Sequence, residues 1–367
     1  MTHRTFQKGS ERTPFPRSPT PFQLSGDKQM KLQHVPVVSR LLTGAALGAA
    51  VIASSSALAQ ASYPDRPITL IAPYSAGGDA DIAGRNFAAA AQKALGQTVV
   101  VVNRTGASGV IGSAMVVAAP PDGYTLLLAR TGSQAILPAI QPTSTKYKWD
   151  DYTFIGTLEL NPYGCTVNAK SPYKAFEDLA RAMRTKGKSL NFGTAGNMTT
   201  NDMGPRQLFK LLKLTPEQTP TMIPYKGTGD TVVSLIAGET DFSCGSMGPF
   251  LSQIKAGALR PMFITNAERM PSMPDVPTAR ELGLPDMEKI VGWSAIYGPA
   301  NMPADVQAKL AAVLKKVAVD SAWQAGTAQT GSIPYVKSPK ETKEFARQQH
   351  ELYRSLGESL GLIDAKM

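Results

Sequence analysis

Short apolar runs alternate along the chain with segments in which apolar residues recur at helical spacing. In the clearest pair, an apolar run begins at Ile68 and ends at Pro73, and a loop of small residues continues to Asp81. Apolar residues then recur every three or four positions as far as Leu95, and Gly96 follows. This pattern predicts a strand, a glycine-containing loop and a helix, in that order.

The alternation continues through most of the chain. Further strands are predicted at 98–102, 124–129, 163–168, 190–193, 221–224, 240–244 and 259–265. Helices are predicted between most of these strands and over much of the C-terminal region, at 304–321 and 340–360. The stretch before Tyr163, rich in Pro and Tyr, is predicted to be irregular. Strands that alternate with helices through short links are typical of an α/β fold with a mostly parallel sheet.

The order of these elements predicts two α/β lobes, the second inserted into the first. Residues 60–165 and 266–367 are expected to form lobe 1, and residues 166–265 lobe 2. The chain is expected to cross between the lobes near Thr166–Ala169 and Met262–Asn266. Because ligands collect at the carboxyl ends of strands in α/β sheets, we expect them in a cleft between the lobes.

The loop before the first predicted helix has the features of an anion site. Ala76, Gly77 and Gly78 have almost no side chain, so their N–H groups and those of the first helical turn can point at a carboxylate. The alternative is a tight turn that needs glycine for a positive φ. Asp79 and Asp81 are interpreted as residues that cap and brace the start of the helix.

The N-terminal region has the pattern of a signal peptide. Lys31 and Arg40 precede a short apolar run, and Ala57-Leu58-Ala59 comes before Gln60. We therefore expect residues 1–59 to be removed and the mature protein to be periplasmic. The mature chain would carry 31 Lys and Arg residues against 26 Asp and Glu residues, a net charge of +5.

The composition excludes several classes of protein. The charges are scattered, which argues against nucleic-acid binding. No G-x-S-x-G, C-x-x-C, H-E-x-x-H or P-loop pattern occurs, and His350 is the only histidine after residue 59. An enzyme, a metal site and a cofactor are therefore not expected. Cys165 and Cys244 allow either a disulfide or two buried thiols.

Six segments together resemble a known family, the Bug-type periplasmic solute-binding receptors of tripartite tricarboxylate transporters. They are YPDRPITLIAPYSAGGDAD at 63–81, VVVVNRTGASGVIGS at 99–113, PPDGYTLLLA at 120–129, LNFGTAGN at 190–197, PYKGTGDTVVSLIAGETDF at 224–242 and MPDVPTARELGLP at 273–285. The resemblance implies a two-lobe clamshell of the periplasmic-binding-protein kind, type II-like. It also implies a monomer that closes on a small organic acid and presents it to a membrane permease.

The resemblance also implies which loops hold the ligand carboxylate. They match 74–81 in one lobe and 194–200 and 225–229 in the other. The chain departs from the family pattern at Arg130, Met198 and Met247, and at Gly204-Pro205. The expected ligand-binding residues are Ser75, Ala76, Gly77, Gly78, Asp81, Arg130, Thr131, Gly132, Ser133, Thr194, Ala195, Asn197, Met198, Thr199, Tyr225, Gly227, Thr228, Asp241 and Met247.

The departures suggest a ligand class. Arg130 is expected either to meet a second carboxylate through its planar fork or to pair with an acid such as Asp81. Met198 and Met247 are expected either to pack on a ring edge or to lie in the core. The expected ligand is an aromatic dicarboxylate such as terephthalate, with short aliphatic di- or tricarboxylates as the alternative. A receptor that signals to a membrane kinase shares the fold and remains the alternative role.

Overall fold

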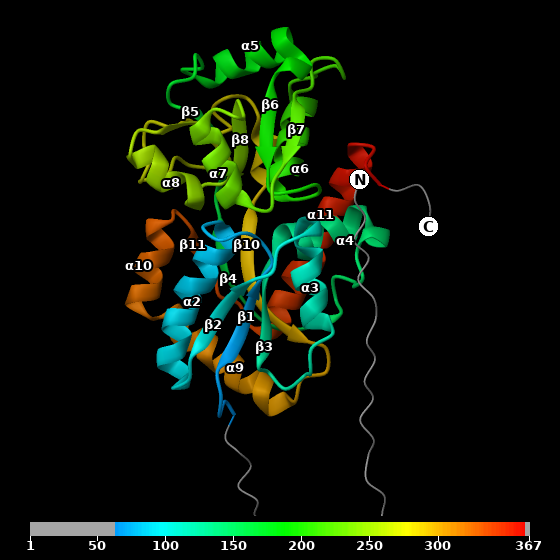
Figure 1. Cartoon of the computed structure of the whole chain (residues 1–367), viewed down its shortest axis with the longest axis vertical. Helices are drawn as coiled ribbons and strands as arrows, with labels where there is room; N and C mark the ends of the chain where they lie inside the picture. Colours follow the sequence, from blue (N-terminus) through cyan, green and yellow to red (C-terminus); the bar gives the residue numbers. More distant parts are fainter. Residues whose placement is uncertain (1–62, 364–367) are drawn as a thin grey trace, which may run out of the picture. The chain divides into compact units, whose positions relative to one another are not determined.

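Two β-sheets flanked by helices organise residues 63–363, which the computed structural model describes (Figure 1). The expected signal peptide and its cleavage site lie outside these residues. The strands are β1 (Ile68–Ala72), β2 (Val99–Asn103), β3 (Thr125–Arg130), β4 (Tyr152–Asn161), β5 (Tyr163–Asn168), β6 (Asn191–Thr194), β7 (Thr221–Pro224), β8 (Phe242–Ser246), β9 (Leu259–Ile264), β10 (Gly292–Pro299) and β11 (Ile333–Pro334). The α-helices are α2 (Asp79–Leu95), α3 (Val110–Val117), α4 (Leu137–Ile140), α5 (Phe176–Lys186), α6 (Thr200–Leu211), α7 (Thr228–Ala237), α8 (Gly248–Lys255), α9 (Ala304–Ala318), α10 (Ser321–Gln329) and α11 (Pro339–Ser359). Shorter turns are η2 (Ala107–Gly109), η3 (Gly132–Ile136, a π-helix), η4 (Pro142–Ser144), η5 (Gly187–Ser189) and η6 (Pro285–Lys289).

The first sheet has the strand order β11-β4-β10-β3-β1-β2 and is mixed, not mostly parallel. Strands β1, β2 and β3 are parallel, as predicted, but β10 is antiparallel to β3 and β4, and β11 is antiparallel to β4. The sequence did not reveal β4 and β10. All eight residues of β10 and nine of the ten in β4 are buried, so neither strand shows the alternation of a half-buried strand. Two α/β lobes are confirmed, but parallel pairing covers only part of each sheet.

The second sheet has the order β7-β6-β8-β5-β9, in which β5 is antiparallel to both of its neighbours. Its strand β5 directly follows β4 of the first sheet, and only Pro162 separates them. The chain returns to the first sheet between Ile264 and Gly292. The boundary expected after residue 165 therefore falls inside β5. The strand was predicted correctly, but the sequence did not show that its first residue already pairs within the second sheet.

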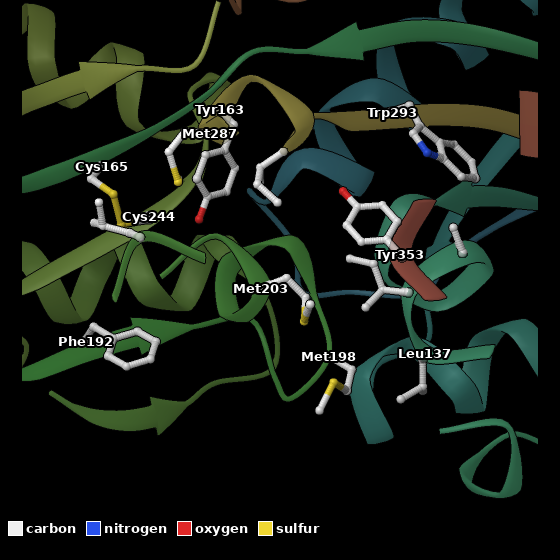
Figure 2. Close-up of a cluster of buried hydrophobic side chains, with 14 of the residues drawn as sticks. Leu137, Tyr163, Cys165, Phe192, Met198, Met203, Cys244, Met287, Trp293 and Tyr353 are labelled. Carbon is white, nitrogen blue, oxygen red and sulfur yellow. A yellow bond between two sulfur atoms is a disulfide. The ribbon is translucent and has the colours of Figure 1, made fainter. Parts of the chain in front are cut away.

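A continuous apolar core joins the two lobes on one side. It includes Tyr163, Phe192 and Met203 from the second lobe and Trp293 and Tyr353 from the first (Figure 2). A separate cluster lies between the first sheet and helices α2 and α9. The helix α6 continues through Gly204-Pro205. A Cβ at Gly204 would lie 1.9 Å from the Tyr163 hydroxyl, so only glycine lets β5 and α6 approach this closely.

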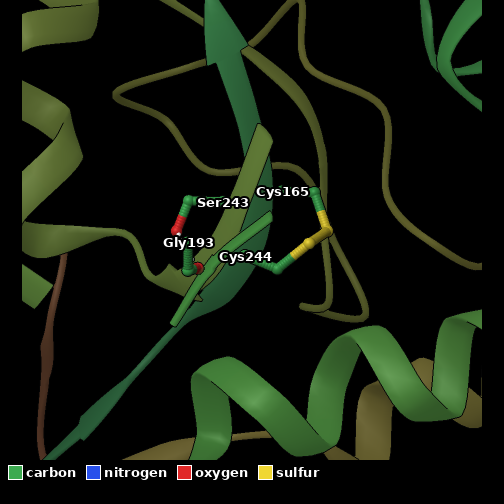
Figure 3. The surroundings of a disulfide bond; sticks show 4 residues. All are labelled: Cys165, Gly193, Ser243 and Cys244. Carbon is green, nitrogen blue, oxygen red and sulfur yellow. Dashed lines mark hydrogen bonds between the residues drawn. A yellow bond between two sulfur atoms is a disulfide. The ribbon is translucent and has the colours of Figure 1, made fainter. Parts of the chain in front are cut away.

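A disulfide joins Cys165 on β5 to Cys244 on β8 (Figure 3). The two residues stand directly opposite each other in the antiparallel ladder, and both are fully buried. Beside them, the Ser243 hydroxyl donates a hydrogen bond of 2.9 Å to the Gly193 carbonyl on β6. Of the two alternatives that the sequence left open, the structure shows the disulfide. Such bonds persist in oxidising compartments.

Candidate ligand site between the lobes

Residues from both lobes enclose a small cavity of about 20 Å³. Its first-lobe wall comes from the end of β1, the start of α2 and the end of β3, and its second-lobe wall from the starts of α6 and α7. The lining residues are Tyr74, Asp79, Ala80, Arg130, Thr131, Gly132, Ala195, Thr199, Thr200, Asn201 and Thr228. A water molecule needs about 10–15 Å³ on this measure, so the space left between the lobes holds little more than one water molecule.

Three helices begin at this cavity. The first residues of α2, α6 and α7 are Asp79, Thr200 and Thr228, and all three line it. The N–H groups of a first helical turn have no partner within their own helix, and each helix terminus carries a partial positive charge. Asn201 also lines the cavity and is 2% exposed, and its amide nitrogen Nδ2 lacks a hydrogen-bond partner among the described residues. This surface favours an anion with several acceptor atoms.

Arg130 supplies the positive side chain in the cavity wall and is 6% exposed. Its Nη1 donates hydrogen bonds to Asn161 Oδ1, at 2.7 Å, and to the Ser294 hydroxyl. Its Nη2 lies 3.9 Å from Asp79 Oδ2. The expected alternative partner of Arg130, Asp81, instead pairs with Arg85 at 2.8 Å. The guanidinium is therefore fixed by the first lobe before any ligand arrives.

Two buried carboxyl groups accompany Arg130. Burial raises the pKa of Asp79 and of Glu159, and the charge of Arg130 opposes that rise in both cases. Burial also raises the pKa of Tyr74 to about 12, so its hydroxyl stays protonated and donates to the Ser108 carbonyl at 2.9 Å. The Tyr74 hydroxyl is therefore a donor, and the positive charge of Arg130 favours the ionised form of both carboxyl groups.

Six of the expected ligand-binding residues meet in the cavity. They are Arg130, Thr131, Gly132, Ala195, Thr199 and Thr228. The cavity also contains Tyr74, Asp79, Ala80 and Thr200, which lie in the expected loops 74–81 and 194–200 but were not among the expected ligand-binding residues. Asn201 lies outside the expected loops; it belongs to the first turn of α6, and the rule that helix N-termini bind anions could have identified it. Asp79 was assigned to capping, but Gly78 is the N-cap residue and makes no side-chain cap.

The middle of the loop expected to hold the carboxylate, residues 75–78, lies outside the lining, although Tyr74, Asp79 and Ala80 of the same loop belong to it. Ala76 and Gly77 are exposed, and the Gly77 N–H donates to Asp81 Oδ2 at 3.0 Å. Gly77 has a φ of +72°, so the tight-turn interpretation is correct for this residue. On the other lobe, a Cβ at Gly229 would lie 2.4 Å from the Ala76 carbonyl oxygen. The residues Ser75 to Gly78 therefore form a lobe contact, and the cavity begins at the next residue.

The other expected residues also lie outside the lining. Met247 is fully buried in an apolar cluster with Phe250, and Met198 is buried in the core that joins the lobes (Figure 2). Asp241 precedes β8, at the opposite end of the strand from the cavity, and accepts a hydrogen bond from the Asn191 N–H. The remaining residues outside the lining are Ser133, Thr194, Asn197, Tyr225 and Gly227. Of these, the Thr194 hydroxyl donates to the Gly196 carbonyl in the turn that precedes α6.

Among residues 63–363, no group of three or more His, Cys, Asp and Glu side chains could hold a metal ion. In the same part of the chain, no helix is long and apolar enough to cross a membrane. Two α/β lobes with a cavity between them are the arrangement of a solute-binding protein.

The comparisons with known proteins agree. The family model described as the tripartite tricarboxylate transporter family receptor matches residues 83–362, and the chain belongs to this family.

Several relatives extend this likeness. The chain is 34% identical to a UPF0065 protein from the TAR-I ttuE-ttuC' intergenic region of Agrobacterium vitis, over 76% of this chain and 79% of that protein. It is 29% identical to protein BugT of Bordetella pertussis, over 84% and 93% of the two chains. The solved structure of periplasmic binding protein BugD has a TM-score of 0.78 at 27% identity, over 82% and 99%. MatC from Rhodopseudomonas palustris, solved with bound malate, has a TM-score of 0.75 at 26% identity, over 80% and 100%. The expected Bug-type receptor is confirmed.

Proposed function

We propose that this receptor captures a small organic carboxylate in the periplasm and delivers it to the membrane permease of a tripartite transporter. The observation that carries the proposal is the meeting of three helix N-termini, from both lobes, at one buried cavity beside Arg130. The unpartnered amide of Asn201 adds a further donor. First-turn N–H groups and a guanidinium suit the acceptor oxygens of a carboxylate. The family and the periplasmic relatives support the same role.

The cavity favours a small aliphatic acid over the aromatic dicarboxylate expected from the sequence. That expectation depended on Met198 and Met247, and both lie in the apolar core. Among the residues that line the cavity, Tyr74 is the one aromatic, and its hydroxyl is already engaged by the Ser108 carbonyl. The likeness to MatC, solved with malate, supports the aliphatic class.

A ligand screen tests this proposal. The mature protein is heated with single members of a panel of aliphatic acids, aromatic acids, sugars and amides, and its unfolding temperature is recorded. An acid at a hundredfold excess over its dissociation constant should stabilise the folded protein by about 2.7 kcal/mol. Mass spectrometry of the same mixtures should return the acid unchanged. Stabilisation by sugars alone, or turnover of the acid, would contradict the proposal.

Closure of the lobes on the ligand gives a separate prediction. A cavity of about 20 Å³ cannot admit a whole organic acid from solution unless the lobes first separate. We expect the rotation at Pro162 and in residues 265–291, where the chain passes between the sheets, and not at Thr166–Ala169 inside β5. Small-angle scattering should show a smaller radius of gyration at saturating ligand.

A matched variant makes this measurement sharper. At Gly229 a Cβ would lie 2.4 Å from the Ala76 carbonyl oxygen, so Gly229→Val should hold the lobes apart. This variant should keep the larger radius with and without ligand. Equal radii for the wild-type protein in both conditions would argue against closure.

A further inference from the structure

The Asp79 carboxylate lies in the wall of the same cavity in which a ligand carboxylate is expected to bind. Its side chain is 10% exposed and lines the cavity wall. As the first residue of α2 it could have pointed to solvent, yet its Oδ2 accepts a hydrogen bond of 2.9 Å from the Thr228 hydroxyl of the opposite lobe. A carboxylate in this position repels an anionic group of the ligand and attracts a ligand group that donates a hydrogen bond.

Arg130 does not fully compensate Asp79, because a second acid already shares its charge. Glu159 is 4% exposed and accepts hydrogen bonds from Asn161 Nδ2, at 2.8 Å, and from the Ser294 hydroxyl, at 3.1 Å. The same Asn161 and Ser294 side chains accept hydrogen bonds from Arg130 Nη1. Glu159 is thus linked to the guanidinium through two bridging side chains. Asp79, at 3.9 Å from Nη2, is the outer acid of a group with two carboxyls and one guanidinium.

This arrangement argues against two-point recognition of a dicarboxylate at Arg130. A second ligand carboxylate beside the guanidinium would also approach Asp79, and like charges in a buried site repel strongly. A hydroxyl or ammonium group has no such conflict and could donate to Asp79. The first residues of α6 and α7, Thr200 and Thr228, line the cavity from the other lobe, where their N–H groups can meet the ligand carboxylate.

We infer that Asp79 determines specificity by accepting a hydrogen bond from the ligand, so that the receptor prefers acids with an ammonium or hydroxyl group beside a carboxylate. This inference rests on the proposed function, since it names the substrate class of the same site. Asp79 thereby selects against an unsubstituted acid of the same length, which brings no donor to this wall.

Titration calorimetry with succinate, malate and aspartate tests the inference, because these acids share one carbon chain and differ in the group beside one carboxylate. The wild-type protein should bind malate or aspartate at least about tenfold more tightly than succinate, as expected for a hydrogen bond to a charged group. In Asp79→Asn this preference should fall to about threefold or less, because the neutral amide binds an ammonium or hydroxyl more weakly. The exposed Asp305→Asn variant, on α9, should keep the wild-type preference.

Three further outcomes separate the explanations. If Asp79 only latches the lobes through Thr228, then Asp79→Asn and Thr228→Val would weaken all three acids by the same factor, which would overturn the inference. Equal binding of succinate, malate and aspartate by the wild-type protein would also overturn it while the proposed function stands. If none of these acids, and no carboxylate of the wider panel, binds, the proposed function itself fails. Unfolding curves of each variant confirm that it is folded.

Discussion

Removing the Cys165–Cys244 disulfide is expected to lower the free energy of unfolding by about 4 kcal/mol. The two cysteines are 79 residues apart in sequence, and cross-linking such a loop restricts the unfolded chain strongly in the chain-entropy model. The loop encloses β6, β7 and helices α5, α6 and α7, so the loss should fall on the second lobe. Urea unfolding of Cys165→Ala/Cys244→Ala against the wild-type protein measures the difference.

Reduction of the wild-type protein is the matched control for this prediction. A thiol reductant should move the wild-type unfolding curve toward that of the double variant and should leave the variant itself unchanged. Labelling of unfolded, unreduced protein should find no thiol at either cysteine. Thiols that react without reduction, together with identical curves for the two proteins, would contradict the disulfide.

Replacing Arg130 by methionine is expected to cost about 3–5 kcal/mol of stability, because breaking a buried ion pair leaves its acidic partners uncompensated. Asp79 and Glu159 both depend on this guanidinium, and the Asn161 side chain loses its donor. Affinity for a carboxylate should fall about 10- to 100-fold, because the cavity loses its positive charge while Asp79 stays in its wall near the anionic ligand. Denaturant unfolding and calorimetry measure the two effects.

The stability loss in Arg130→Met should grow with pH. Burial raises the pKa of Asp79 and Glu159 in the folded protein, and Arg130 holds both values down. Without Arg130 both folded-state values rise further, so the folded variant binds more protons than its unfolded chain above about pH 4. Its stability should therefore fall as pH rises toward those values. The difference from the wild-type protein should be smaller at pH 4 than at pH 8.

Arg181→Met serves as the control for this substitution. Arg181 is exposed on α5, and its ion pair with Asp178 spans 3.8 Å. Exposed pairs contribute up to about 1 kcal/mol. This variant should therefore show a small loss of stability and unchanged ligand affinity. A similar loss in both variants, or a pH-independent loss in Arg130→Met, would contradict the role assigned to the buried network.

Strands bounded by recognisable turn residues could be predicted from the sequence, even where they are as buried as β5, whereas the buried strands β4 and β10 could not. Strand β5 and strand β7 occupy the predicted residues, because polar or turn-forming residues bound each of them. Strand β10 was missed because a wholly buried strand has no polar alternation and resembles a connector with glycine and proline at its ends. Strand β10 lies between β3 and β4 and is antiparallel to both, so the first sheet is mixed.

The candidate site could be predicted as a set of loops but not as a set of side chains. The strand-end rule led to the loops at Thr131 and Thr199, and both reach the cavity. Ligand binding was predicted for the glycine loop before α2, whereas the first turn of α2 lines the cavity. The sequence alone could not show that the Gly77 N–H donates to Asp81. Likewise, the sequence shows Asp79 only as an acidic residue at the start of a helix. Its hydrogen bond from the Thr228 hydroxyl joins the two lobes and depends on how they pack.

A crystal structure with the acid that binds best in the screen tests the central claim most directly. We expect a ligand carboxylate between the lobes, within hydrogen-bond distance of first-turn N–H groups of α6 or α7, with Asn201 and Arg130 in its surroundings. The pocket on lobe 1 beside Trp149 and His350, which is larger and more open, should be empty. A ligand bound in that pocket, with the interlobe cavity unoccupied, would contradict the account.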